Sequence, residues 1–497
     1  MNQSGAGMTT STVTRPRRRF WRLSVRGLMV LVLVVGGVLG WQARRASVQR
    51  RAVAQLVAEG IGTSFDYEYD SEGTYLVNSR PRAPGWLRRA VGDEWFRELA
   101  SVDVYPGTLK AGKLSESAIR AAGSLDRLDK LRVYNVPLTD DEFSRMLSLS
   151  RPRQILFQET EATPAALRRI ASLGSVNDLT VRFKRPVCGS SCLPALTEMT
   201  RLKRLWLTNL ESFPPEEMVA LRSLCRLEAL LIKNSPGDES CLEHIRGLTA
   251  LKSLVLQQTK VTDKGLKRLA PLRTLEELLV DGSEITDSGL SALAGWPMLT
   301  NLSLYLDSAW SSSTLLGGQR APRGCLTDAG LVTVAKASGL KHLALSGSRF
   351  SDIGLAALSQ LPALADLDLN GVEVTTDGVR KLLAAHQFES LELSGPTVAD
   401  EWLPLLANQK RLVLLSLQGP RITDAGMAAV VAQPTASYLD FSGSSLTDRG
   451  LATLAASTCP YRLVSVRGTK VTEAGVAAFR SAKPRCKLIW EPVRTKD

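Results

Sequence analysis

The stretch LVLQQTKVTDKGLKRL, residues 254–269, contains the pattern that decides the fold of this chain. Its first and third residues, Leu254 and Leu256, lie on one face of a strand, and Leu266 and Leu269 lie on one face of a helix. Thr262 is suited to begin that helix, because its hydroxyl oxygen can cap free backbone amides. We therefore interpret the stretch as one strand and one helix, which bury their apolar faces only by stacking on neighbouring copies.

The same unit recurs along most of the 497 residues, mostly at intervals of about 24 residues. An apolar anchor opens each predicted strand, and a second apolar residue follows it two positions later; the anchors are Leu131, Ile155, Leu179, Leu205, Leu230, Leu254, Leu278, Leu302, Leu343, Leu367, Leu391, Leu415, Leu439, Val464 and Leu488. Val102 and Val104 predict one further strand before them. The interval from Leu302 to Leu343 is 41 residues long and contains an insertion at residues 307–325.

The helix-start motif recurs with the strands, as in Thr286-Asp287, Thr327-Asp328 and Thr447-Asp448. A carboxylate in this position favours the positive end of the helix dipole. We interpret these Asp residues as helix-start residues and not as catalytic acids.

This pattern resembles the leucine-rich-repeat family, in the helix-containing version shared by ribonuclease-inhibitor-like proteins and the repeats of F-box proteins. The resemblance covers about residues 102–490 and implies an α/β solenoid, a horseshoe with a parallel concave sheet and outer helices. No F-box precedes the repeats. The Asn that many members place after the strand is replaced by residues such as Thr259 and Pro396, which leaves the hydrogen bonding of that turn open.

The net charge of +13 is concentrated at the amino end, where residues 1–60 hold ten Arg and one Glu and the rest of the chain carries only +4. Lys and Arg are therefore not gathered on the folded body as nucleic-acid binding requires, and we expect a membrane surface and no nucleic acid. Residues 27–41, GLMVLVLVVGGVLGW, are uncharged, and Trp21 and Trp41 lie twenty residues apart. Twenty helical residues span about 30 Å, the thickness of the bilayer hydrocarbon.

We expect one uncleaved transmembrane helix, in a layout that resembles bacterial membrane-anchored repeat proteins. A cleaved signal peptide is the alternative, but no small-x-small cleavage site follows Gly40, and four Arg come soon after it. Six Arg precede the span, so the positive-inside tendency places the amino terminus in the cytoplasm and the repeats outside it.

These features divide the chain into six expected parts. They are a basic cytoplasmic tail at 1–26, a transmembrane anchor at 27–41, a juxtamembrane helix at 42–61, a capping region at 62–101, leucine-rich repeats at 102–490 and a tail at 491–497. Within the capping region we expect a strand from Phe65 to Tyr69. A helix from Trp86 to Leu99 is then expected to close the end of the solenoid.

The residue between the two core positions of each strand is expected to face the concave side. In the first half these residues are apolar, and the candidates are Trp206, Leu231, Val255 and Leu279. In the second half they are small or acidic, and Asp366 joins Asp368, Glu392 and Asp440 as a candidate. We expect a protein partner to pack an apolar element on the first set and to offer basic groups to the second. The insertion, with Trp310, Arg320 and Arg323, is either a further contact or a disordered tether.

Motifs for chemistry are missing from the sequence. It holds no phosphate-binding loop, no His-Glu-x-x-His pair and no Gly-x-Ser-x-Gly turn, and its three His fall in separate repeats. The seven Cys are interpreted as free thiols, with a disulfide between Cys188 and Cys192 as an alternative. We expect no enzyme activity, no cofactor, no metal and a monomer. Two functions remain open, namely a membrane-anchored protein-binding scaffold and a dedicated inhibitor or recognition subunit that masks a single enzyme.

Overall fold

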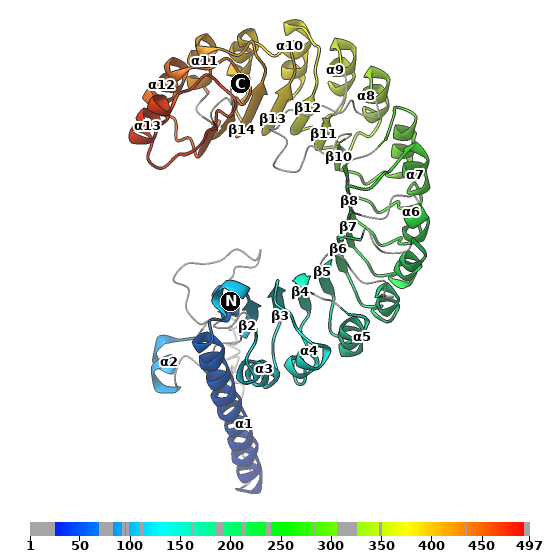
Figure 1. Cartoon of the computed structure of the whole chain (residues 1–497), viewed down its shortest axis with the longest axis vertical. Coiled ribbons are helices and arrows are strands. Elements are labelled where there is room, and N and C mark those ends of the chain that lie inside the picture. The colour runs from blue at the N-terminus through cyan, green and yellow to red at the C-terminus, as the bar shows by residue number, and fades with distance from the viewer. Residues whose placement is uncertain are drawn as a thin grey trace, which may run out of the picture.

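The chain folds into an open horseshoe with strands along its inner side and helices along its outer side, as a computed structural model shows (Figure 1). The residues that it describes are 25–68, 83–91, 95, 99–109, 113–160, 163–183, 192–210, 215–234, 240–281, 284–305, 326–346, 350–433 and 435–491. This is the leucine-rich-repeat solenoid that the sequence predicts.

One 17-stranded sheet lines the horseshoe. β1 (Gly62–Phe65) pairs antiparallel with β2, and each later strand pairs in parallel with the strand that follows it. The parallel strands are β2 (Leu99–Val104), β3 (Lys130–Tyr134), β4 (Gln154–Thr160), β5 (Asp178–Phe183), β6 (Arg204–Thr208), β7 (Ala229–Lys233), β8 (Ser253–Gln257), β9 (Glu277–Asp281), β10 (Asn301–Tyr305), β11 (His342–Ser346), β12 (Asp366–Asn370), β13 (Ser390–Ser394), β14 (Leu414–Gln418), β15 (Tyr438–Asp440), β16 (Leu463–Ser465) and β17 (Lys487–Ile489).

The register of the sheet follows the predicted anchors. Leu302 pairs with Leu343, so the strands on either side of the insertion align as if the insertion were not there. Val102 pairs with Leu131, which confirms the additional first strand. Both core positions of a strand are buried, as Leu254 and Leu256 show, while alternate residues face the other side. The core is therefore one continuous apolar layer between the sheet and the outer helices.

The outer layer contains both α-helices and 3-10 helices. The α-helices of the repeats are α3 (Glu116–Gly123), α4 (Asp140–Met146), α5 (Pro164–Leu173), α6 (Ser240–Ile245), α7 (Asp263–Arg268), α8 (Asp328–Val334), α9 (Asp352–Leu358), α10 (Thr376–Ala385), α11 (Met427–Val431), α12 (Asp448–Ala456) and α13 (Glu473–Ala482). The 3-10 elements beside them are η3 (Pro106–Thr108), η4 (Leu193–Glu198), η5 (Pro215–Ser223), η6 (Gly289–Gly295), η7 (Asp400–Asn408) and η8 (Asp424–Gly426).

Helices begin where the sequence predicts, with one exception. Thr262, Thr327, Ser351 and Thr447 each cap the following helix through the side-chain oxygen. At Thr286 the helix starts later, with η6 at Gly289, although the Thr286 hydroxyl still accepts the amide of Ser288 at 3.3 Å.

The Asp residues at the helix starts bond to the next repeat as well. The carboxylate of Asp263 accepts the backbone amide of Thr286 at 2.7 Å and its hydroxyl at 2.6 Å. The same paired bonds, which we call rungs, join Asp287 to Thr327, Asp328 to Ser351, Asp352 to Thr375, Asp400 to Thr423, Asp424 to Thr447 and Asp448 to Thr472. Gly in the motif gives this carboxylate room, since a Cβ on Gly354 would lie 2.5 Å from Asp328 Oδ1.

The turn that follows each strand is bonded through the backbone. The amide of Asn209 donates to the carbonyl of Lys233 at 3.1 Å, and the amide of Gly371 donates to Ser394 at 2.7 Å. Such bonds between consecutive repeats replace those that the family Asn would supply. Thr259, which takes the place of that Asn, has a buried hydroxyl with no hydrogen-bond partner in the part of the chain that the structure describes.

The amino end of the solenoid is covered by α1 (Val25–Ala58) and by β1, whereas the sequence analysis expected the closing helix within residues 86–99. The carboxyl half of α1 packs on α3 and buries Ala52 and Leu56. Among the described residues of the helix expected at Trp86–Leu99, α2 (Gly85–Val91) is helical, Trp86 is exposed, and Leu99 begins β2. The strand expected at Phe65–Tyr69 ends at Phe65 and gives way to η1 (Asp66–Glu68).

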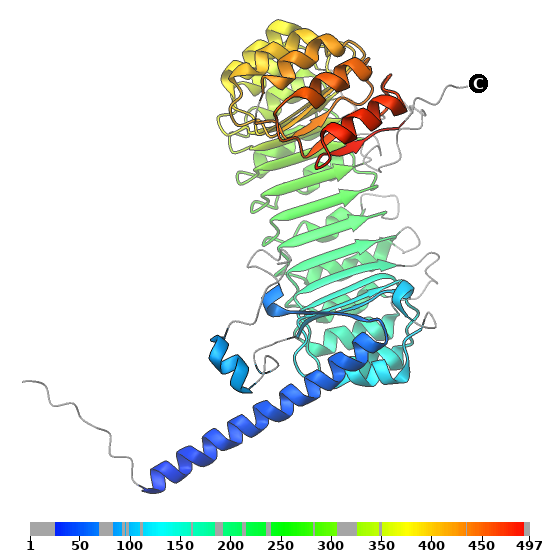
Figure 2. The same cartoon turned by 90° about the vertical axis from the view of Figure 1, so that its left-hand side faces the viewer.

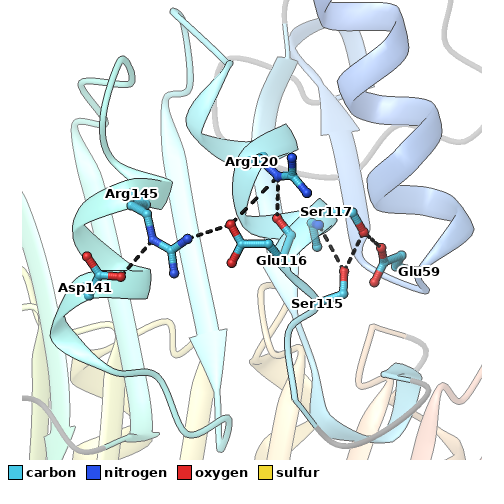
Figure 3. Close-up of polar contacts among 8 residues, drawn as sticks. Glu59, Ser115, Glu116, Ser117, Arg120, Asp141 and Arg145 are labelled. Atoms are coloured by element: carbon cyan, nitrogen blue, oxygen red, sulfur yellow. Dashed lines mark hydrogen bonds and ion pairs between the residues drawn. The ribbon is translucent and has the colours of Figure 1, made fainter.

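A chain of polar contacts ties α1 to the first two repeats (Figure 3). The hydroxyl of Ser117 donates to the carboxylate of Glu59 at the end of α1. On the neighbouring helix, Arg145 contacts Glu116 at 2.6 Å and Asp141 at 2.9 Å. At the other end of this packed segment, Arg45 forms an ion pair with Asp126 at 3.0 Å. The expected juxtamembrane helix is therefore part of the folded solenoid.

Candidate functional site on the concave face

The sheet presents one residue from the middle of each strand to the inside of the horseshoe. Strands such as β7, β8, β12 and β13 show strict alternation between buried core residues and partly exposed concave residues. Because the strands are parallel and in register, their middle residues form a row across the sheet. We call this the concave row.

The four predicted apolar residues are brought together in this row. Trp206 pairs with Leu231, Leu231 with Val255, and Val255 with Leu279, on four consecutive strands. Trp206 is 46% exposed, and the other three are partly exposed. A large aromatic ring beside three aliphatic side chains is an apolar strip open to solvent, and strips of this kind are common at protein interfaces.

The second half of the row contains small buried residues between its acidic residues, which are partly exposed. Ser303 and Ala344 separate the apolar strip from the acidic residues, and Ala344 is 0% exposed. Ser416, between Glu392 and Asp440, is 1% exposed. Trp206, in the first half, is therefore the most exposed of the candidate residues in the concave row.

The acidic residues are close to one another but weakly solvated. Asp368 and Glu392 are direct neighbours in the register, and Asp440 follows two strands further on, beyond Ser416. Burial, with a smaller effect of the Glu392 charge, raises the pKa of Asp368 to about 7. Burial and then Asp440 raise the pKa of Glu392. Near neutral pH the Asp368 carboxyl is therefore only partly ionised, so this part of the row carries less negative charge than the sequence predicts.

Asp366 lies apart from this group, at the start of β12. Its carboxylate is 3.9 Å from Nδ1 of His342 on the neighbouring strand. Burial raises the pKa of Asp366, and the nearby imidazole counteracts this effect. Asp366 is on the concave side, but its closest charged contact is His342 and not Asp368.

Tyr305 and Asp281 belong to the acidic site, and the sequence analysis did not name them. They are register partners at the ends of β10 and β9, and both are buried. Burial raises the pKa of the Tyr305 phenol, and the charge of Asp368 raises it further. Tyr305 stands two residues after Ser303 of the concave row, so the alternation of the strand would have identified it.

The insertion, the alternative disulfide and a metal site remain to be considered as other kinds of site. Trp310, Arg320 and Arg323 of the insertion lie outside the described residues, as does Cys188 of the alternative disulfide. Among the described residues, no group of three or more His, Cys, Asp or Glu side chains has the arrangement that would hold a metal ion. The concave row is therefore the candidate site that the structure allows us to describe.

Comparisons with known proteins agree with the repeat architecture. The family model described as leucine-rich repeat matches residues 272–294. The chain is similar to an internalin of Listeria monocytogenes (15% identity, 80% of this chain and 87% of that one, TM-score 0.37) and to a leucine-rich-repeat protein of Leptospira interrogans (16%, 78% and 94%, 0.38). It is also similar to a chain of the yeast Rad7–Elc1 complex (14%, 94% and 98%, 0.46). No curated protein sequence matches the chain.

Proposed function

We propose that this protein is a membrane-anchored scaffold that binds a protein partner on its concave face. The observation that carries the proposal is the apolar strip of Trp206, Leu231, Val255 and Leu279, which stands open on a rigid sheet in continuous register. Extended concave surfaces of this kind are what repeat proteins use for binding. The adjacent acidic residues add polar recognition at one end of the strip.

Membrane anchoring is supported by the amino half of α1. Its apolar side chains are exposed around the helix, from Val25 at 76% to Trp41 at 55%. The stretch Leu28–Ala58 is long and apolar enough to cross a membrane by length and composition. A helix that is apolar all round requires lipid or protein around it. The same helix continues without interruption into the segment that caps the solenoid, which favours an anchor over a cleaved leader.

Two cell experiments test the anchor. The full chain should stay with membranes after carbonate extraction, and release into the soluble fraction would contradict the proposal. Protease added to intact cells should digest the repeats if they lie outside the cytoplasm, as the distribution of Arg around the span predicts.

Binding is tested by capture with the full-length protein as bait. The double variant Trp206→Ala with Asp368→Lys should lower recovery of the partner at least about 30-fold, because removing a central Trp of an interface commonly costs about 2 kcal/mol or more. The matched control is Trp86→Ala with Asp377→Lys, which changes the same residue types on exposed outer helices. Equal recovery with both double variants would rule out the concave row. The structure offers no specific observation for a dedicated inhibitor, so this alternative is not proposed.

A further inference from the structure

The two edges of the solenoid differ in charge. One edge consists of the loops that lead from each helix into the next strand, and we call the part preceding β3 to β11 the basic edge. Its loops are residues 124–129, 147–153, 174–177, 199–203, 224–228, 246–252, 269–276, 296–300 and 335–341. They contain 11 Lys and Arg and four Asp and Glu. On the opposite edge, the described loop residues after β3 to β10 contain Lys260, Glu284 and Asp287 as charged groups.

The four acidic residues of the basic edge are all engaged by cations. Asp126 pairs with Arg45, and Asp129 lies 3.9 Å from Arg153. Glu228 pairs with Lys203 at 2.7 Å, and Glu276 with Lys252 at 3.5 Å. Eleven cationic side chains against four carboxylates leave this edge with a charge of +7 within a solenoid that is close to neutral as a whole.

Basic residues at helix ends also complement the helix dipole, but this effect does not account for the positive charge of the basic edge. The dipole acts within the last turn of a helix. Arg201, Arg226 and Arg273 lie three to five residues beyond the helix ends Glu198, Ser223 and Arg268. Their side chains are exposed.

The basic edge is the side on which α1 leaves the solenoid. The carboxyl end of α1 contacts Ser117 near the start of α3, whereas Arg45, some four turns earlier, contacts Asp126 beyond the end of α3. The apolar segment that precedes Arg45 therefore projects past the loop 124–129. Figure 2 shows the same geometry, since the strands point away from the side toward which the amino end of α1 extends.

Cations also line a hollow on this edge. A groove of about 700 Å³ is lined by Arg246, Lys267, Arg268 and Arg273, and its other lining residues are Ala, Pro and Gly. Arg246 forms an exposed ion pair with Glu243 of the preceding helix turn. Guanidinium and ammonium groups around a shallow groove suit a phosphodiester oxygen, which accepts charge-assisted hydrogen bonds.

From these observations we infer that the basic edge lies on the anionic lipid headgroups of the membrane that holds α1, with a headgroup phosphate in the groove between Arg246 and Arg273. This inference rests on the proposed anchor. Its second basis is charge complementarity, because clusters of Lys and Arg close to a membrane surface are attracted to anionic lipids within about a Debye length. The solenoid then lies with its basic edge on the membrane, and the concave row remains accessible.

Amine acetylation of the full chain in vesicles tests the inference. Vesicles of phosphatidylcholine alone are compared with vesicles that also contain phosphatidylglycerol. Lys252, Lys336 and Lys341 are exposed lysines of the basic edge, and Lys260, Lys264 and Lys470 are exposed lysines elsewhere that serve as internal controls. The edge lysines should react at least about threefold more slowly on anionic vesicles, the controls should not change, and 1 M salt should remove the difference.

Each outcome separates the inference from the anchor. A chain that does not float with either kind of vesicle contradicts the anchor, and a chain that floats but shows equal edge reactivity on both kinds overturns the edge contact. The variant Arg246→Glu with Arg273→Glu should abolish protection of Lys252 while the chain still floats. The matched variant Lys260→Glu with Lys264→Glu should keep that protection, and an equal loss in both variants also overturns the inference.

Discussion

The first half of the solenoid, β3 to β8, and the second half, β11 to β16, join their repeats in different ways. In the first half, after β3, β6, β7 and β8, the residue two positions after the second core residue has a positive φ and is Asn or Gln, namely Asn135, Asn209, Asn234 and Gln258. In the second half the same position is Gly, as at Gly371 and Gly443. The rungs from Asp to Thr or Ser begin at Asp263 and run through the second half.

This difference shows that different side chains join the repeats in the two halves, within the same loops between strand and helix. In the first half, Asn209 donates to the carbonyl of Phe183 at 2.8 Å, and Asn234 donates to the side chain of Asn209 at 3.3 Å. In the second half the turn Gly has no side chain to contribute, and the carboxylates at the helix starts supply the bonds. The concave row changes in the same region, from an apolar strip to acidic residues separated by buried Ser and Ala.

The largest expected effect is a pH dependence of the stability, which arises from Asp368 in the second half. Asp368 is held protonated by burial, so its pKa rises from 3.8 to about 7 on folding. The folded state then binds more protons than the unfolded state between about pH 4 and 7, and stability falls as pH rises through this interval, by on the order of 4 kcal/mol. Urea midpoints between pH 4 and 8 measure this slope. Asp368→Asn should flatten it, and an unchanged slope would show that Asp368 is solvated.

The second largest effect is a loss of stability when a side chain is added close to the carboxylate of a rung. Gly354→Ala places a methyl group against Oδ1 of Asp328 and against the Leu331 side chain, 2.5 and 2.6 Å away. Overpacking of this kind costs about 1 to 3 kcal/mol, so the urea midpoint should fall clearly. Gly247→Ala is the matched control, because a Cβ there meets nothing within 4 Å. Equal midpoints for the two variants would mean that the motif glycine is not needed for the rung.

The strands and their register could be predicted from the sequence, whereas the rungs could not. Two apolar residues with a period of two specify a buried strand face locally, so even the 41-residue interval left the alignment of Leu302 with Leu343 intact. A rung joins residues 23 or more positions apart, and each Asp also makes sense as a helix-start residue, so the local pattern gives no sign of the second role.

One repeat shows how the rung could have been recognised. In the repeat of α10, Thr376 takes the position of the rung Asp. In the next repeat, Ala399 takes the position of the capping Thr, and the buried Trp402 takes the position of the motif Gly. All three residues of the rung are therefore replaced together, as expected if the Gly exists to make room for the Asp.

The candidate site was predicted in its composition but not in its exposure. Alternation along each strand places Trp206 and Asp368 on the concave side. How far each is covered depends on side chains of neighbouring strands, such as Tyr305, and on the curvature of the sheet. The cap was missed because the segment that follows an apolar span looks like a free extension, while its contacts with α3 involve residues such as Leu56 that are distant in sequence from their partners.

A third, smaller effect separates the two kinds of carboxylate at helix starts. Asp352→Ala removes the acceptor of two bonds to Thr375 and should destabilise the protein by about 1 to 2 kcal/mol. Asp377→Ala is the control in the next repeat, since Asp377 forms only an exposed pair with Arg380 on its own helix, which is typically worth less than about 0.5 kcal/mol. Denaturation midpoints of the two variants should therefore differ, and identical midpoints would remove the rungs as the link between repeats.

The smallest expected effect concerns the turns of the first half, where a substitution should stabilise the protein. Gln258 has a φ of 52°, a conformation that costs a residue with a side chain about 1 to 2 kcal/mol, while Gly adopts it freely but loses more chain entropy on folding. Gln258→Gly should therefore gain about 0.5 kcal/mol, measured as a higher urea midpoint. Asn234→Gly relieves a similar φ of 55° but removes the bond to Asn209, so it should bring no gain. If both variants were equally stabilised, the Asn234 side chain would contribute nothing between repeats, and the difference between the halves would rest on the rungs alone.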